Sequence, residues 1–314
     1  MTFAGIGEAA ALGTAACWAC TSVWFSAAGV RVGSLVVNLL RMPIAFAWFA
    51  AWGLLVRGEV FPVDTSLHAW IWLSISGLVG FAFGDLCLFR ALVLIGPRLA
   101  SLLMATAPPL TAIVGWLVLD ERLSSIAMLG MLLTTAGIAW TIAVRNAEVD
   151  PVVAHVPHDR AERRRFALGV VLALGGALGQ GGGLVLSKYG MGGDDPFASS
   201  QIRVLAGALG FAAILTVMRR WPAVVRAFSD RPAMLRLGLG ATFGPFLGVA
   251  LSLVAVQHTE TGIAASLLAT APILVIPLAV RFGGERVGTS ALLGTVLAVI
   301  GVVLLVGPGA VGER

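Results

Sequence analysis

The sequence predicts an all-α polytopic membrane protein with ten transmembrane helices, arranged as two inverted five-helix repeats. Three observations support this prediction: the composition, the number of apolar runs and a duplicated phrase. The chain has 314 residues, of which 58% are hydrophobic and 12% are charged, and its mean hydropathy is +0.95. Soluble domains contain about 25% charged residues, so half that share indicates that lipid surrounds the chain.

Ten apolar runs are long enough to cross a membrane, because a bilayer core of about 30 Å requires roughly 20 apolar residues in a helix. The runs cover approximately residues 8–29, 34–56, 69–95, 98–119, 125–144, 166–188, 196–218, 233–256, 261–281 and 288–308. The first run has no basic segment before it and begins a series of similar runs. We therefore expect it to be a first span and not a cleaved signal.

A duplicated phrase relates the two halves of the chain. The segment Ala105-Thr106-Ala107-Pro108 recurs as Ala269-Thr270-Ala271-Pro272, 164 residues later. The same shift places Gly80 on Gly244, Gly84 on Gly248, Gly130 on Gly294, Gly137 on Gly301, and Glu121-Arg122 on Glu285-Arg286. One offset that aligns this many positions indicates an internal duplication.

The polar segment 145–165 separates five runs from five. We therefore expect a first repeat at 1–144, a basic connecting loop at 145–165 and a second repeat at 166–314. Because five crossings is an odd number, the second repeat begins on the opposite side of the membrane and is inverted. Inverted repeats are a common plan of secondary transporters, in which the substrate binds near the midplane where the repeats meet.

Positive charge predicts the orientation of the chain. Fourteen arginines lie at the gaps on one side, and four arginine or lysine residues lie on the other. Because basic loops remain cytoplasmic, we expect both termini outside the cytoplasm. The sequence pI near 10.0 has the same origin, since the arginines occupy short gaps and not the basic, aromatic-rich patches that bind nucleic acid.

The chain resembles the EamA family of the drug/metabolite transporter superfamily over about residues 8–308. The resemblance depends on the ten runs, on spaced glycines in the last run of each half, and on an A-T-A-P helix followed by the acidic-basic turns Asp120-Glu121-Arg122 and Glu285-Arg286. It implies a carrier of small metabolites, since many relatives export amino acids or related compounds, and it implies no universal set of catalytic residues. Leu40-Arg41 and Ile202-Arg203 resemble the family's leucine–arginine pair early in the second helix of each repeat.

Four charged residues lie inside predicted spans and away from their ends: Arg41, Asp85, Arg90 and Arg203. A charge in a membrane helix costs at least about 2.5–3.5 kcal/mol, so it usually faces a partner or a cavity. Asp85 is predicted either to pair with Arg41 or Arg90 and fix helix packing, or to respond to protons or substrate. Arg203 would suit a substrate that bears a carboxylate, and snorkelling to lipid headgroups is the alternative.

Prolines interrupt the fourth and ninth runs at Pro108 and Pro272, with Thr106 and Thr270 two residues earlier. A proline inside a helix frees a backbone carbonyl, which in a membrane must face protein or a water-lined cavity. These two helices are therefore predicted to line the substrate pathway, and a packing kink without a ligand is the alternative. Gln180, within a glycine-rich stretch, is predicted to be a polar contact in a pocket.

The sequence predicts no catalytic residues, no metal site and no cofactor, because it contains neither a phosphate-binding G-x-x-x-x-G-K-[ST] loop nor an H-E-x-x-H zinc motif. The predicted function is ATP-independent export of a small organic metabolite, such as an amino acid or a related compound. The protein would be a multi-pass component of a cell inner membrane and would work by alternating access. Its predicted partners are the lipid bilayer and a small-molecule substrate, with no nucleic acid. The alternatives are a membrane-embedded enzyme and a non-transporting receptor or scaffold.

Overall fold

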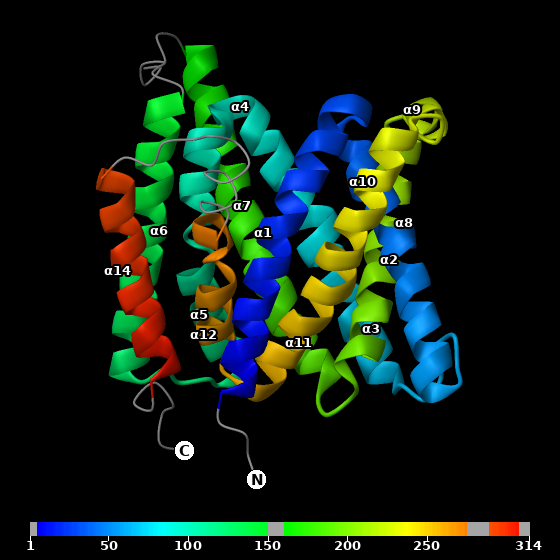
Figure 1. Ribbon diagram of the computed structural model, residues 1–314, viewed down its shortest axis with the longest axis horizontal. Coiled ribbons are helices and arrows are strands. Elements are labelled where there is room, and N and C mark those ends of the chain that lie inside the picture. The colour runs from blue at the N-terminus through cyan, green and yellow to red at the C-terminus, as the bar shows by residue number, and fades with distance from the viewer. Residues whose placement is uncertain (1–4, 150–159, 275–288, 308–314) are drawn as a thin grey trace. The chain divides into compact units, whose positions relative to one another are not determined.

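The computed structural model describes residues 5–149, 160–274 and 289–307, and no strand occurs in these ranges (Figure 1). The helices are α1 (Ile6–Val32), α2 (Ser34–Arg57), α3 (Leu67–Gly77), η1 (Leu78–Phe83), α4 (Gly84–Met104), α5 (Ala107–Leu119), α6 (Ser125–Val149), α7 (Arg160–Met191), α8 (Pro196–Val217), α9 (Trp221–Ala227), α10 (Arg231–Ala241), η2 (Thr242–Gly248), α11 (Val249–His258), α12 (Thr261–Leu268) and α14 (Thr289–Val306). The segments η1 and η2 are π-helices.

Within the described residues, eight helical segments are long and apolar enough to cross a membrane, and they coincide with eight of the predicted runs. They are Ser34–Arg57, Leu67–Gly96, Leu99–Leu119, Ser125–Val144, Arg160–Met191, Pro196–Val217, Arg231–His258 and Thr289–Val306. The shorter apolar helix Thr261–Leu274 begins at the ninth predicted run, and α1 covers the first. The predicted all-α polytopic fold is thus confirmed.

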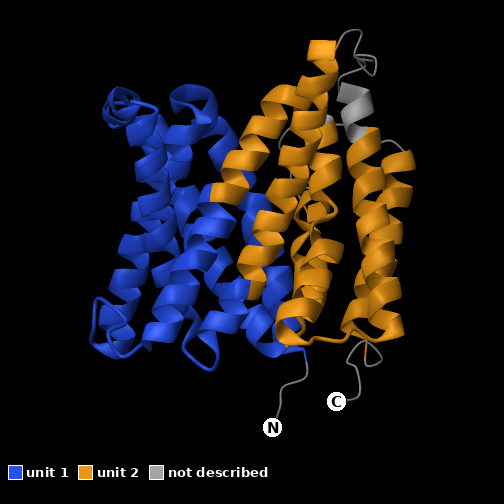
Figure 2. Ribbon diagram, turned by 180° about the vertical axis from the view of Figure 1, so that it is seen from behind, with its two compact units in different colours: residues 1–82, 186–258 blue, residues 83–185, 259–314 orange. Residues whose placement is uncertain are grey.

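The chain forms two compact units, and each unit contains helices from both halves of the sequence (Figure 2). Unit 1 consists of residues 1–82 and 186–258, and unit 2 consists of residues 83–185 and 259–314. A unit is therefore not a repeat. Its helices come together by tertiary packing between the two halves of the chain.

In unit 2, α6 and α14 pack side by side through the duplicated glycines (Figures 1 and 2). A Cβ on Gly130 would lie 3.0 Å from the carbonyl oxygen of Gly301, and one on Gly294 would lie 3.0 Å from that of Gly137. Small residues of this kind let membrane helices approach each other closely. The positions that the duplication aligns therefore touch each other in the folded protein.

This contact also shows that the fifth helices of the two repeats run in opposite directions. Gly130 and Gly137 follow one another along α6, whereas their partners Gly301 and Gly294 occur in the reverse order along α14. The crossing is therefore antiparallel and nearly two-fold symmetric. Both properties are expected of inverted repeats.

The two π-helices occupy corresponding positions of the repeats, because the 164-residue shift places Leu78, where η1 begins, on Thr242, where η2 begins. Both lie against helices of the opposite repeat in unit 1. A Cβ on Gly207 of α8 would lie 2.9 Å from the Phe81 ring, and one on Gly244 of η2 would lie 2.9 Å from Thr21 of α1. π-Helical turns are rare and often mark functional sites.

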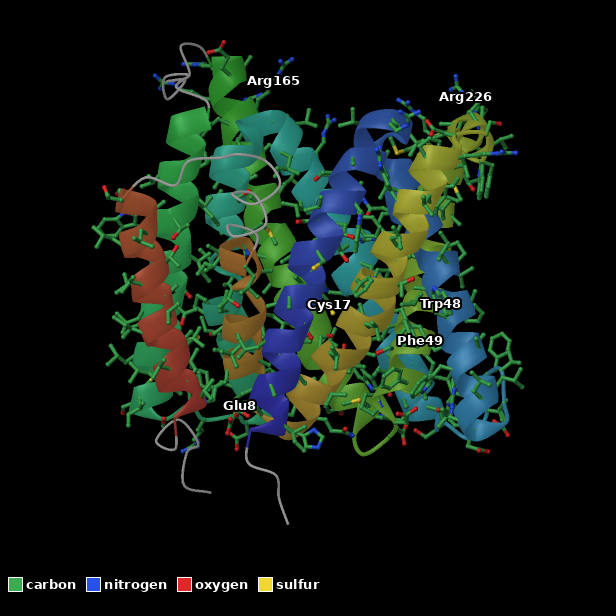
Figure 3. All side chains as sticks on the ribbon, viewed as in Figure 1. Glu8, Cys17, Trp48, Phe49, Arg165 and Arg226 are labelled. Carbon is green, nitrogen blue, oxygen red and sulfur yellow. The ribbon has the colours of Figure 1, made fainter. Side chains whose placement is uncertain are left out.

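Aromatic packing fills the centre of unit 1. Phe49 of α2 is 1% exposed, and its ring centroid lies 4.9 Å from that of Phe246 in η2 and 6.3 Å from that of Phe197 in α8. The neighbouring residue Trp48 stacks on Phe246 at 6.2 Å, and Figure 3 labels Trp48 and Phe49 on α2. This cluster holds the first turn of α8 against α2.

A charged contact joins the ends of α1 and α10 outside the spans. Arg31 Nε lies 2.9 Å from a carboxylate oxygen of Asp230, and Asp230 also accepts a hydrogen bond from the backbone N–H of Ala233 as the N-cap of α10. The Ala233 hydrogen bond, followed by the Arg31 guanidinium, holds the pKa of the Asp230 carboxyl below its usual value.

The glycine crossing in unit 2 can be tested by adding one methyl group. Gly137→Ala would drive a Cβ into the backbone of α14 at Gly294 and Ala298, so we expect a loss of stability of about 1–3 kcal/mol, as for other overpacked sites. Thermal unfolding of the purified protein in detergent measures this loss. Gly238→Ala in α10 is the matched control, because no atom lies within 4 Å of its added Cβ. Equal melting temperatures for the two variants would contradict the close crossing.

Candidate substrate-binding residues

The first A-T-A-P phrase breaks the fourth crossing into two helices. α4 ends at Met104 and α5 begins at Ala107. At the break the Thr106 hydroxyl donates a hydrogen bond to the carbonyl of Leu103 at 2.6 Å. The helix-interior proline predicted from the sequence is therefore a proline in the first turn of a new helix, where its missing N–H leaves no gap.

The second phrase folds in the same way. α12 ends at Leu268, and the Thr270 hydroxyl donates to the carbonyl of Leu267 at 2.6 Å. Pro272 then lies in the helical turn that follows. Thr270 is only 5% exposed, and both threonine hydroxyls donate to their own backbone. A pathway role for Thr106, Pro108, Thr270 and Pro272 stays a prediction.

Residues beside the two helix breaks pack against α6 and α14, the helices that cross through the duplicated glycines. Ala105 and Ile273, one from each break, share a buried cluster with Ile138 of α6 and Ala298 of α14. The duplicated phrase thus places two short broken helices against the antiparallel pair α6 and α14.

Glu121, from the acidic-basic turn of the first repeat, caps a helix of the second. Its carboxylate oxygen Oε2 accepts hydrogen bonds from the backbone N–H of Thr261 at 2.8 Å and from the Thr261 hydroxyl at 2.5 Å. Thr261 is the first residue of α12, where an acceptor satisfies an orphan donor and a negative charge suits the helix dipole. Gly115 makes room, since a Cβ there would lie 2.8 Å from Glu121 Oε2.

The two arginines of the leucine–arginine pairs occupy equivalent places in their helices. Arg41 is the eighth residue of α2, and Arg203 is the eighth residue of α8. The guanidinium carbon of Arg41 lies 5.7 Å from the centroid of the Phe25 ring, and that of Arg203 lies 5.1 Å from the centroid of Phe81. Both distances are within the range of cation–π contacts.

The side chain of Arg203 is buried within the protein. It is 4% exposed, and its Nε has no hydrogen-bond partner among the described residues. Its neighbour Gln201 is engaged elsewhere: the amide nitrogen donates to the carbonyl of Val60 at 2.7 Å, and the amide oxygen accepts from Arg57 at 3.3 Å. The snorkelling alternative therefore does not fit the buried side chain.

The remaining predicted site residues lie in unit 2. Asp85 is in the first turn of α4 and is 8% exposed. Arg90, five residues later on the same helix, is exposed, as is Gln180 on α7. Arg41 belongs to unit 1, and its pairing with Asp85 stays a prediction.

Glu8 is a buried acid that the sequence analysis did not single out. It lies in the first turn of α1 and is 9% exposed, and Figure 3 labels it near the start of that helix. In the sequence it stands only at the start of the first apolar run. Burial by the packed ends of neighbouring helices is not visible in a local pattern.

The titratable side chains do not form a metal site within the described part of the chain, where no group of three His, Cys, Asp or Glu residues is suitably placed. Cys17, Cys20 and Cys87 are free thiols. The polar side chains among the candidate site residues are those of Arg41, Asp85, Thr106, Gln180, Arg203 and Thr270.

A profile of the EamA-like transporter family matches residues 5–143 and matches again over residues 167–307. The chain belongs to the EamA-like transporter family. The two matched segments correspond to the two halves that the 164-residue shift superposes.

Two further comparisons give a short match to a transporter and a solved structure of similar fold. An uncharacterized transporter of Archaeoglobus fulgidus is 47% identical over 78 residues, which is 25% of this chain and 28% of that protein. A solved crystal structure has the same fold, with a TM-score of 0.70 and 19% identity over 94% of this chain and 95% of the other. The fold of that solved structure is thus shared over nearly the whole chain.

The cap that Glu121 provides in this EamA-like chain is testable. Glu121→Ala should remove two hydrogen bonds at the start of α12 and lower stability by about 0.5–2 kcal/mol, as other lost helix caps do. The melting temperature of the purified variant measures the loss. Arg122→Ala is the control, because the Arg122 side chain is 81% exposed. If Glu121→Ala and Arg122→Ala had the same melting temperature, the Glu121 cap would not stabilise the fold.

Proposed function

We propose that this protein is a secondary transporter that exports a small organic metabolite across the cell inner membrane without ATP. Its two inverted repeats would alternate access to a substrate site between them. The antiparallel crossing of α6 and α14 carries this proposal, because inverted repeats that pack about a two-fold axis are the structural basis of rocking in many secondary transporters. Membership of the EamA-like transporter family supports the same function.

The broken helices also support transport. Backbone that departs from a regular helix is tolerated at membrane depth only where it is buried in protein or lines a water-filled cavity. The breaks at Thr106 and Thr270 and the π-helices η1 and η2 are such departures, and they occur at matching places in the two repeats. Discontinuous helices in matching places are typical of substrate and ion sites in secondary transporters.

Transport activity can be measured with the purified protein in liposomes. We expect liposomes loaded with a protein-free cell extract to release at least one small organic solute without ATP, because neither repeat carries a nucleotide-binding loop. Mass spectrometry of the external medium identifies the solute, and liposomes without protein are the control. A strict requirement for ATP would contradict a secondary transporter.

The same experiment separates the alternative functions. A membrane-embedded enzyme would convert a component of the extract into a new chemical species, which mass spectrometry would detect inside the liposomes. A receptor or scaffold would leave the internal and external solutes unchanged. Either result would contradict the proposed function.

The proposed orientation places both termini outside the cytoplasm, because fourteen arginines lie at the gaps on one side and four basic residues lie on the other. Reporter fusions at the C-terminus should therefore behave as periplasmic, and fusions within residues 145–165 should behave as cytoplasmic. A cytoplasmic C-terminus would reverse the orientation while leaving the inverted repeats in place.

A further inference from the structure

The first two turns of α8 carry a cluster of buried polar side chains within unit 1. Ser199 and Ser200 are 0% exposed and Arg203 is 4% exposed. Residues three and four apart are neighbours on one helix face, so Arg203 lies on the same face as both serines. This is a polar surface in a chain where most buried residues are apolar.

These three side chains lack the partners that buried polar groups normally have. Six buried side-chain polar atoms have no hydrogen-bond partner among the described residues, and three of them are Ser199 Oγ, Ser200 Oγ and Arg203 Nε. The large majority of buried polar groups in folded proteins are hydrogen-bonded. Half of the exceptions in the described chain thus fall within five consecutive residues.

Several other buried helical hydroxyls in this protein are satisfied by their own backbone, although that of Thr135 is not. Thr14, Thr141 and Ser266 each donate to the carbonyl four residues earlier, at 2.8–2.9 Å. This back-bonding is the usual solution for serine and threonine inside a helix. Ser199 and Ser200 depart from it, and their hydroxyls therefore remain as donors for another group.

The surroundings of Arg203 leave the edge of its guanidinium without an acceptor. The Phe81 ring lies 5.1 Å from its Cζ, and Gly77 of α3 packs directly against its backbone. An aromatic ring does not replace the hydrogen-bond acceptors that the N–H donors of a guanidinium need in its plane. Neither a hydrogen bond nor an ion pair of the Arg203 side chain occurs in the described part of the chain.

We propose that Arg203, together with Ser199 and Ser200, binds the carboxylate group of the transported solute. The planar guanidinium matches a carboxylate in two parallel hydrogen bonds, and the serine hydroxyls are additional donors on the same face. One cation is neutralised by one singly charged carboxylate, whereas a doubly charged phosphate would leave net charge buried. This inference rests on the proposed transport function and names the chemical class of its substrate.

A substrate role and a structural role for Arg203 predict opposite effects on stability. Removing a structural arginine that is paired in the folded protein leaves its partner uncompensated and destabilises the fold. Removing an arginine whose partner is an absent substrate relieves a buried charge. We therefore expect Arg203→Gln to melt at the wild-type temperature or above it when no substrate is present. A lower melting temperature would contradict the inference.

The decisive experiment uses liposomes loaded with the protein-free cell extract and compares wild type, Arg203→Gln and Arg226→Gln. The control residue Arg226 is exposed on α9 and labelled in Figure 3. We expect the released solutes to bear a carboxylate, and their efflux to fall about 30-fold or more in Arg203→Gln, as when one partner of a buried charge pair is removed. Efflux by Arg226→Gln should match wild type.

Two additional measurements test the chemistry directly. The carboxamide of each released carboxylate should not be transported by the wild type, because it lacks the negative charge. The double variant Ser199→Ala with Ser200→Ala should lose about three- to tenfold in efflux, as expected for neutral hydrogen-bond donors. An unchanged double variant would remove the serines from the site.

The outcomes distinguish this inference from the proposed function. Release of solutes that lack a carboxylate, or normal carboxylate efflux by Arg203→Gln, would overturn the carboxylate site and leave the transporter assignment intact. No release of any solute by the wild type would overturn the proposed function, and the substrate site with it.

Discussion

Inside a bilayer every backbone carbonyl and N–H group needs a partner within the protein, and this requirement governs where the helices of this chain can break. At both A-T-A-P breaks a threonine hydroxyl donates at 2.6 Å to the carbonyl three residues earlier. The proline then lies in the first turn of the next helix, where it needs no N–H partner. The duplicated phrase is therefore a self-contained helix break that works in either direction across the membrane.

The broken helices need support from neighbours, because a helix of eight residues such as α12 is marginal by itself. Glu121 supplies that support at the start of α12, and the cluster of Ala105, Ile138, Ile273 and Ala298 supplies it at the breaks. Both contacts join one repeat to the other within unit 2. Short helices that would be unstable within one repeat are thus stabilised by contacts with residues of the other repeat.

The membrane spans and the duplication could be predicted from the sequence alone, because both are local or repeating properties of the chain. It could not show that Gly130 and Gly301 touch, because a shift of 164 residues aligns equivalent positions and says nothing of which positions meet. The same limit applies to Glu121 and Thr261, which are 140 residues apart. The only sign of the π-helices in the sequence is the set of glycines that the duplication aligns. The burial of Glu8 depends on the packing of other parts of the protein around its turn.

The site residues show the same division between what a sequence specifies and what packing decides. The sequence shows that Arg203 is a charged residue within an apolar segment. That segment is equally compatible with a snorkelling side chain and with a buried one. Packing of α3 and η1 against α8 decides between them, because Gly77 and Gly207 let the helices approach until the guanidinium is covered. A covered cation with open hydrogen-bond donors lowers stability, and proteins depart from locally consistent packing mainly at functional sites. In the proposed site, a bound carboxylate would supply the hydrogen-bond acceptor that Arg203 lacks within the described part of the chain.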